Sequence, residues 1–203
     1  MADRSLRAAL SPRTVHLCID MQRIFAPGGL WAAPWMERVL PVVVELAGRF
    51  PERTIFTRFI PPQRPDDMPG MWQVYYQRWR QATREHIDPK ELDLVDSLGR
   101  FAPPAHVIDK SRYSAFAGTA LLGALQECQA DGLIITGSET DVCVLATVLD
   151  AVDLGIRVIV VTDGICSSSD EGHDALLKVY HGRYSQQIET AKAEMVLRSW
   201  PRS

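Results

Sequence analysis

The sequence predicts an α/β fold, a three-layer α/β/α sandwich around a central, mostly parallel, doubly wound sheet of six strands. Short runs rich in β-branched residues alternate with longer segments of helical periodicity, which is typical of βαβ units. The chain has 203 residues and no evident internal repeat or low-complexity tract. We therefore expect a single domain, 1–203, with a substantial core.

The strands are expected where apolar runs stop at a polar residue or a glycine. The first run ends at Asp20, the third at Lys110 and the fourth at Thr136-Gly137, and a weaker sixth strand is expected at an edge. The approximate strand ranges are 14–20, 53–58, 105–109, 132–137, 157–162 and 186–190.

The helices are expected between these runs. The clearest one places Val144, Val148 and Val152 on one face, and Gly155 follows it as a typical helix stop. The approximate helix ranges are 35–49, 70–82, 117–129, 142–154 and 171–182.

The stretch between the second strand and the third differs from the rest. Residues 59–70 contain four prolines, which exclude a regular helix or a central strand, and residues 71–80 are rich in aromatic side chains and arginine. A long insertion after the carboxyl end of a strand is expected to form a lid or wall of a pocket, an interface, or a surface excursion whose aromatics pack beneath it. The sequence leaves these alternatives open for 59–82.

Composition excludes several classes of protein. The formal net charge of −3 gives no reason to expect nucleic acid or an anionic membrane as a partner. No apolar run approaches the roughly 20 residues of a membrane span, and residues 1–13 lack the apolar core of a signal peptide. The four cysteines, Cys18, Cys128, Cys143 and Cys166, lack paired spacing, so we expect no disulfide framework and a reducing, cytoplasmic location.

Three residues of different chemistry follow three strands. Asp20, Lys110 and Cys143 lie at or just beyond strand carboxyl ends, which converge on one rim of a parallel sheet. Cys143 falls in the first turn of a helix, where backbone N–H groups favour a thiolate. Each alone has an ordinary explanation: Asp20 could cap a turn, Lys110 could be a solvated loop residue, and Cys143 could be a packed core thiol. Together they indicate a nucleophile with an acid–base partner.

The chain resembles the isochorismatase-like cysteine hydrolase family, which includes nicotinamidases and N-carbamoylsarcosine amidase-type enzymes. The matching segments are 18–25, 110–116, 136–144 and 150–164. The resemblance implies an Asp20–Lys110–Cys143 triad, an oxyanion hole made by the backbone N–H groups of Glu139 and Cys143, and a cis peptide at Ser138–Glu139. It also implies a homodimer or homotetramer. The turn 137–140 has an ordinary interpretation as well, with Thr140 or Asp141 as the helix cap.

A metal site of the nicotinamidases has no counterpart here. Those relatives carry an Asp-x-His cluster after the second strand, where this chain has Thr57-Arg58-Phe59. His86, His106, His173 and His181 lie elsewhere at spacings that suggest no common site, and His173 is expected to have a structural role at a helix start. We therefore expect no cofactor and no catalytic metal, which makes nicotinamide a less favoured substrate.

The expected pocket is aromatic with two cations. Arg58 and Arg112 are candidates to bind a carboxylate or ureido oxygen. Packing in the core is an equal alternative for each aromatic side chain. The candidate aromatic wall consists of Phe25, Trp72, Tyr113 and Phe116.

These observations favour a metal-independent cysteine hydrolase that cleaves a C–N bond of a small amide or ureido compound through a Cys143 thioester. One alternative is isochorismatase-type vinyl-ether hydrolysis, which in the family accompanies loss of the cysteine. Another is a non-catalytic binding domain on the same fold, which has no need of Asp20, Lys110 and Cys143 together. Fast alkylation of Cys143 by iodoacetamide at neutral pH is expected of the enzyme. The sequence does not identify the substrate.

Overall fold

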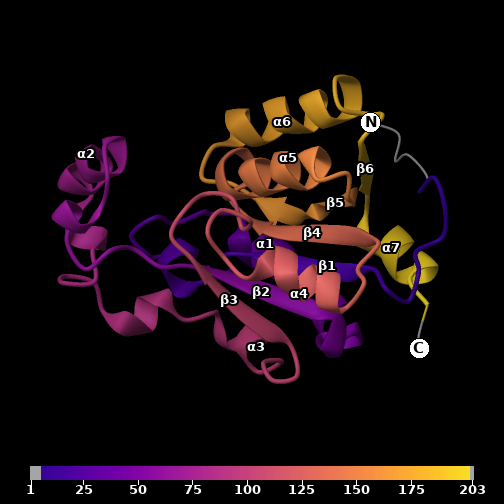
Figure 1. Ribbon diagram of the computed structural model, residues 1–203, viewed down its shortest axis with the longest axis horizontal. Helices are drawn as coiled ribbons and strands as arrows, with labels where there is room; N and C mark the ends of the chain where they lie inside the picture. The colour runs from indigo at the N-terminus through magenta and orange to yellow at the C-terminus, as the bar shows by residue number, and fades with distance from the viewer. Residues whose placement is uncertain (1–5, 202–203) are drawn as a thin grey trace.

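The computed structural model describes residues 6–201 and confirms the α/β/α sandwich (Figure 1). Its six strands form one sheet in the order β3-β2-β1-β4-β5-β6, and every neighbouring pair is parallel. The chain order reverses between β1 and β4. Ligands of open α/β sheets bind at the carboxyl ends of the strands beside such a switch point.

The strands lie close to the ranges expected from their apolar runs. Only β5 is clearly longer, since it continues to Cys166, which is fully buried. The bounds are β1 Val15–Ile19, β2 Thr54–Phe59, β3 His106–Lys110, β4 Gly132–Ser138, β5 Arg157–Cys166 and β6 Ile188–Ala191.

One glycine allows β1 and β4 to lie side by side. Gly137 has a φ of +114°, and a Cβ atom built on it would lie 2.0 Å from the carbonyl oxygen of Ile19. No other residue type fits there without moving a strand. This contact holds the end of β1 against the end of β4.

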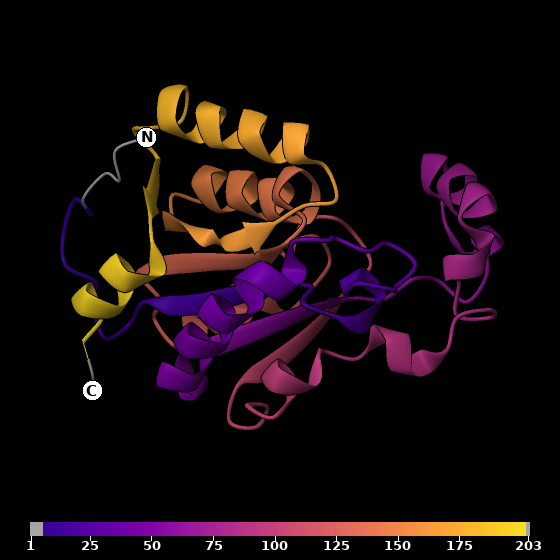
Figure 2. The same cartoon turned by 180° about the vertical axis from the view of Figure 1, so that it is seen from behind.

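Helices cover both faces of the sheet (Figures 1 and 2). The first face carries α1 (Met36–Arg49), α3 (Asp96–Gly99) and α7 (Ala193–Ser199). The second face carries α4 (Leu121–Glu127), α5 (Leu145–Asp153) and α6 (Asp170–Gly182). The short helices α3 and α7 were not expected, because four and seven residues give too little periodicity to recognise.

The helix expected over 117–129 is shorter in the structure. Gly118 takes a φ of +70°, so a turn precedes α4. The Thr119 hydroxyl then accepts a hydrogen bond from the Leu121 N–H. At the other end, Gln129 has a φ of +52°, which is not a helical backbone angle, so the helix cannot continue through it.

An arm, residues 60–92, leaves the sheet after β2 and carries α2 (Met71–Arg78), which stands apart from the three layers (Figure 1). It also contains the single turns η3 (Pro65–Asp67), η4 (Arg80–Ala82) and η5 (Pro89–Leu92). The helix expected over 70–82 ends early because Trp79 has non-helical backbone angles, φ −100° and ψ 42°.

A buried glutamine binds the chain at both ends of the arm. The Gln22 side chain donates to the carbonyls of Phe59, at 3.1 Å, and Leu92, at 2.8 Å, and accepts from the Phe59 N–H at 2.6 Å. Gln22 follows β1, so the arm is fixed relative to the strand that carries Asp20. Two further single turns are η1 (Arg23–Phe25) and η2 (Pro51–Arg53).

Within residues 6–201, no helix has the length and apolar character that crossing a membrane requires.

Candidate active site

Asp20, Lys110 and Cys143 meet at the carboxyl rim of the sheet. Asp20 directly follows β1, Lys110 ends β3, and Cys143 lies in η6 (Thr140–Val144), a wide helical turn between β4 and α5. Lys110 Nζ lies 2.7 Å from Asp20 Oδ2, and both side chains are fully buried. The buried Cys143 thiol lies close enough to both groups for their charges to shift its pKa. The sequence prediction that these three side chains converge is therefore correct.

The Asp20 carboxylate is held in place by the neighbouring strand. The Thr57 hydroxyl donates to Asp20 Oδ1 at 2.6 Å, and the Asp20 N–H donates to the Thr57 carbonyl at 3.2 Å. Asp20 has a φ of +50°, a backbone conformation that non-glycine residues rarely adopt and that is common at functional sites. Thr57 thus orients the carboxylate, a role that the sequence analysis missed.

The Lys110 ammonium reaches Asp20 from the edge strand. Its path crosses β2, where Nζ lies 4.9 Å from the centre of the Phe59 ring. Nζ also donates to the carbonyls of Arg112 and Tyr113, both at 3.0 Å. Burial opposes the charge, but Asp20 and Cys143 raise the pKa of Lys110 above its ordinary value, so the ammonium stays charged.

The thiol of Cys143 differs from the sequence expectation. Burial raises the pKa of the Cys143 thiol well above its ordinary value, the Asp20 carboxylate raises it further, and Lys110 lowers it only in part. The expected preference for a thiolate is therefore wrong. The structure favours a neutral thiol beside the Asp20 carboxylate.

The turn that carries Cys143 is tied down by side chains. The Ser138–Glu139 peptide is cis, as the resemblance implied. The expected cap at Thr140 or Asp141 is wrong, because no side chain caps this turn. Instead Thr140 Oγ1 and His173 Nδ1 lie 2.8 Å apart, and the Ser167 hydroxyl donates to Asp141 at 2.6 Å.

These contacts give His173 a structural position, buried in the first turns of α6. Glu139 belongs to the same set of contacts, since its Oε1 accepts a hydrogen bond from the Ser168 N–H at 2.9 Å. The turn is thereby fixed to the connection between β5 and α6.

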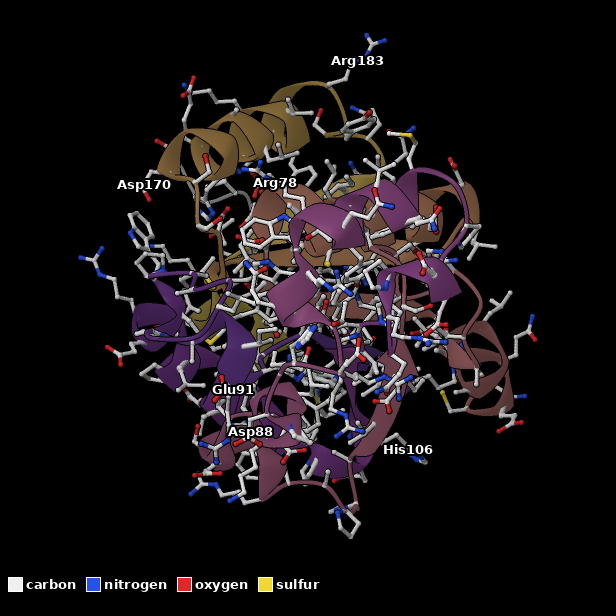
Figure 3. All side chains as sticks on the ribbon, turned by 90° about the vertical axis from the view of Figure 1, so that its left-hand side faces the viewer. Arg78, Asp88, Glu91, His106, Asp170 and Arg183 are labelled. Carbon is white, nitrogen blue, oxygen red and sulfur yellow. The ribbon has the colours of Figure 1, made fainter. Side chains whose placement is uncertain are left out.

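A cavity of about 460 Å³ opens beside Cys143. The non-aromatic residues that line it together with Cys143 are Leu30, Ala32, Glu139, Val142 and Ser168. Its aromatic lining comprises Phe25, Trp31, Phe59, Tyr75, Trp79 and Tyr113. Tyr75 belongs to α2 and Trp79 directly follows it, so the arm forms one wall of the cavity. Figure 3 looks onto this end of the molecule, with Arg78 of α2 facing the viewer and Asp88 and Glu91 in the lower left part of the view.

Of the six residues expected to line the pocket, Phe25 and Tyr113 do so. Trp72 lies behind the wall, with its ring centre 4.8 Å from that of Tyr113. Phe116 packs on the core beneath α4 and α5.

The two arginines expected in the pocket lie elsewhere. Arg58 binds Asp109 through Nε at 2.7 Å and Nη2 at 2.9 Å, and it also reaches Asp93. Arg112 lies over the Trp72 ring, 5.4 Å from its centre, and donates to the Ser111 carbonyl. Successive strand residues point to opposite faces, so Thr57 and Phe59 face the site while Arg58 faces away.

Sequence reasoning missed most of the aromatic wall. Trp31 lies in the loop before α1, and Tyr75 and Trp79 lie on the arm. These residues were not predicted because they lie far in sequence from the strand ends. The aromatic content of 71–80 was the one signal that pointed to them.

The residues present do not form a metal site of the nicotinamidase kind. Residues 6–201 contain no group of three or more His, Cys, Asp or Glu side chains placed to hold one ion. At the equivalent strand end, Arg58 is an ion-pair partner of Asp109. No step of the reaction is therefore assigned to a metal.

A second cavity, of about 370 Å³, lies at the opposite end of the sheet. Val15, Thr54 and His106, at the amino ends of three strands, line it together with Cys128, which caps α4 as a helix-end residue. None of Asp20, Lys110 and Cys143 reaches it. Parallel α/β sheets bind ligands at the carboxyl ends, so the aromatic cavity is the candidate site.

Comparisons with known proteins agree with this arrangement. The isochorismatase domain family matches residues 14–192. The nicotinamidase of Escherichia coli strain K12 is 47% identical over 183 residues, covering 76% of this chain and 83% of that protein. An uncharacterized isochorismatase family protein of Bacillus subtilis strain 168 is 38% identical over 86 residues, covering 42% of this chain and 47% of that protein.

The crystal structure of a cysteine hydrolase from Pseudomonas syringae pv. phaseolicola 1448A shares the fold. It superposes with a TM-score of 0.80 and covers 98% of each chain, at 22% identity. The family match spans most of the sequence, and the sheet and its flanking helices agree with it. This protein therefore belongs to the isochorismatase family and is a hydrolase of that family.

Proposed function

We propose that this protein is a cysteine hydrolase that cleaves a C–N bond of a small amide or ureido compound through a thioester on Cys143. The observation that supports this most strongly is the buried contact of Cys143 with Asp20 and Lys110 beside an aromatic cavity. The similarity to a protein named nicotinamidase adds support for an amide substrate.

In the first step, Cys143 Sγ attacks the substrate carbonyl carbon as the thiol proton passes to Asp20. Transfer during attack suits a thiol whose pKa is raised, because no free thiolate has to exist beforehand. The carbonyl oxygen gains the negative charge, and the backbone N–H groups of Glu139 and Cys143 are proposed to stabilise it.

In the second step, the tetrahedral intermediate collapses. Asp20 gives its proton to the departing nitrogen, the C–N bond breaks, and ammonia or an amine leaves. The acyl group remains on Cys143 as a thioester.

Water then releases the acyl group. Asp20 takes one proton from the attacking water, the C–S bond breaks, and the proton passes to Cys143 Sγ. The acid product leaves with the water oxygen, and the resting thiol and carboxylate are restored. Lys110 keeps Asp20 oriented and offsets its negative charge throughout.

A screen for ammonia release across small amides and ureas tests this function. The wild type should hydrolyse some of them. Cys143→Ala and Asp20→Asn should each lose at least about 10³-fold in kcat/KM, as removal of a nucleophile or its base does elsewhere. Unchanged circular dichroism establishes that the variants fold. Wild-type hydrolysis by Cys143→Ala would refute the mechanism.

Two alternatives give different outcomes in the same screen. A vinyl-ether hydrolase would release no ammonia and would tolerate loss of Cys143, and a binding domain would turn over nothing. We also propose that the reaction needs no metal, so activity should survive dialysis against EDTA. A cytoplasmic location is part of the proposal, since a reducing compartment keeps Cys143 a free thiol.

A further inference from the structure

The aromatic cavity has an uneven charge. Glu139 places a carboxylate on its wall, whereas none of the described residues that line it is an arginine or a lysine. The Lys110 ammonium, which lies beside Cys143, is already bound to Asp20 and to two backbone carbonyls. Asp20 and Lys110 offset each other, so Glu139 is the one charged side chain among the described residues that line the cavity.

The rings of the cavity surround Trp31. Its centre lies 5.9 Å from the centres of Phe25 and Phe59, and 6.0 Å from that of Trp79. Tyr75 completes the group at 6.3 Å. The faces of such rings carry partial negative charge and attract cations within about 6 Å. Two cations already lie near these rings, the Lys110 ammonium at Phe59 and the Arg78 guanidinium 5.9 Å from the centre of Trp79, although neither Lys110 nor Arg78 lines the cavity.

The carboxylate is fixed relative to these rings. Glu139 Oε1 accepts the Ser168 N–H at 2.9 Å, and Glu139 directly precedes η6, which is itself held by Thr140 and Asp141. Burial and the neighbouring acidic groups raise the pKa of Tyr75 and of Tyr113, so both stay neutral phenols. A substrate carboxylate entering this cavity would lose its water without gaining a cationic partner.

We propose that this cavity selects amides whose distal group is a cation, such as a quaternary ammonium, and rejects those whose distal group is a carboxylate. The inference rests on the proposed amide hydrolysis and deepens it by naming the substrate class. Glu139 and the ring faces around Trp31 determine the preference. Arg58 and Arg112 do not reach the cavity to reverse it.

Three amides with the same three-methylene spacer isolate the effect of charge. They are 4-(trimethylammonio)butanamide, its uncharged isostere 5,5-dimethylhexanamide, and glutaramate, which ends in a carboxylate. We expect kcat/KM for the cation to exceed that for the isostere by about tenfold, within the range of ring–cation attraction. Glutaramate should be the poorest of the three.

Two variants test whether Glu139 causes the preference for the cationic amide. Glu139→Gln keeps the shape and the acceptor for Ser168, and should lower the ratio of cation to isostere several-fold. Asp109→Asn removes a carboxylate that pairs with Arg58 and does not line the cavity, so it should leave that ratio unchanged. A ratio that is unaffected by Glu139→Gln, or a preference for glutaramate, would overturn the proposal.

Binding to the Cys143→Ala protein separates this inference from the catalytic one. Quenching of tryptophan fluorescence by each amide reports affinity without turnover, since Trp31 and Trp79 line the cavity. If no amide is hydrolysed but the cation binds best, the mechanism fails and the charge preference stands. Failure of the cationic amide to bind more tightly than its isostere overturns the preference, whatever the activity.

Discussion

At the level of single residues, the buried thiol of Cys143 lies beside the ion pair of Asp20 and Lys110. The carboxyl-end rule for parallel sheets predicted that these three side chains meet. The state of the thiol was not predictable, because its pKa depends on burial by parts of the chain far away in sequence. Thr57 was missed for a similar reason, since it contacts Asp20 from the neighbouring strand, far away in sequence.

Alkylation of Cys143 should depend on pH in a way that reflects its raised pKa. The reactive species is the thiolate, so the rate with iodoacetamide should keep rising above pH about 8.5, where an ordinary thiol is half ionised. The neutral-pH rate should therefore be slow rather than fast, contrary to the expectation from the sequence. Mass spectrometry measures the alkylation rate of Cys143 in the Cys128→Ser variant, which lacks the exposed cysteine. A plateau below pH 7 would contradict the assignment.

A second residue-scale prediction concerns His16, which lies fully buried between Thr54 and Thr136. Burial lowers the pKa of His16 from 6.5 to about 3. The folded state therefore keeps the ring neutral, whereas the unfolded chain takes up a proton below pH 6.5. The stability linked to His16 is present above that pH and is lost as the pH falls toward 3.

Between pH 7 and pH 5 this linkage should remove about 2 kcal/mol from the free energy of unfolding. Urea unfolding at the two pH values measures it. The His16→Gln variant has no titrating ring and should lose less than about 1 kcal/mol over the same interval. Equal pH dependence in both proteins would rule out His16 as the cause.

At the scale of elements, β1 and β4 form the switch point, and their ends are held by a glycine contact. The β-branched runs predicted all six strands within a few residues, apart from the end of β5. The arm was recognised as irregular from its prolines. Its position was not predictable, because Gln22 fixes it through hydrogen bonds to Phe59 and Leu92. For that reason Tyr75 and Trp79 were absent from the predicted pocket.

Replacing the switch-point glycine should be costly. In Gly137→Ala the new Cβ atom meets the Ile19 carbonyl oxygen at 2.0 Å and requires a φ near +114°. We expect a loss of at least about 3 kcal/mol in the free energy of unfolding, typical of a strained or overpacked site. Urea denaturation measures it.

Gly123→Ala is the matched control. Gly123 lies in α4, and a Cβ atom there has no neighbour within 4 Å. The change should be neutral or stabilise the protein by about 0.5–1 kcal/mol, because alanine favours a helix. Equal effects of the two substitutions would show that the β1–β4 contact is not the cause.

At the scale of the whole molecule, we propose that the chain associates with itself through the arm, as a homodimer or homotetramer. Met71 and Val74 on α2 are 77% and 50% exposed, although the arm carries much of the cavity wall. Light scattering at micromolar concentration should give a mass at least twice that of one chain. Met71→Glu combined with Val74→Glu should lower it. A single-chain mass for the wild type would reject the proposal.

We propose that Cys143 carries the acyl group during turnover. Mass spectrometry of the enzyme quenched in acid during hydrolysis of an amide tests it directly. We expect a mass increase equal to the acyl group, located on the peptide that contains Cys143 and removed by hydroxylamine, as a thioester would be. Cys143→Ala should show neither the adduct nor turnover. Hydrolysis that continues in Cys143→Ala, with no adduct on the wild type at any quench time, would rule out a thioester on Cys143.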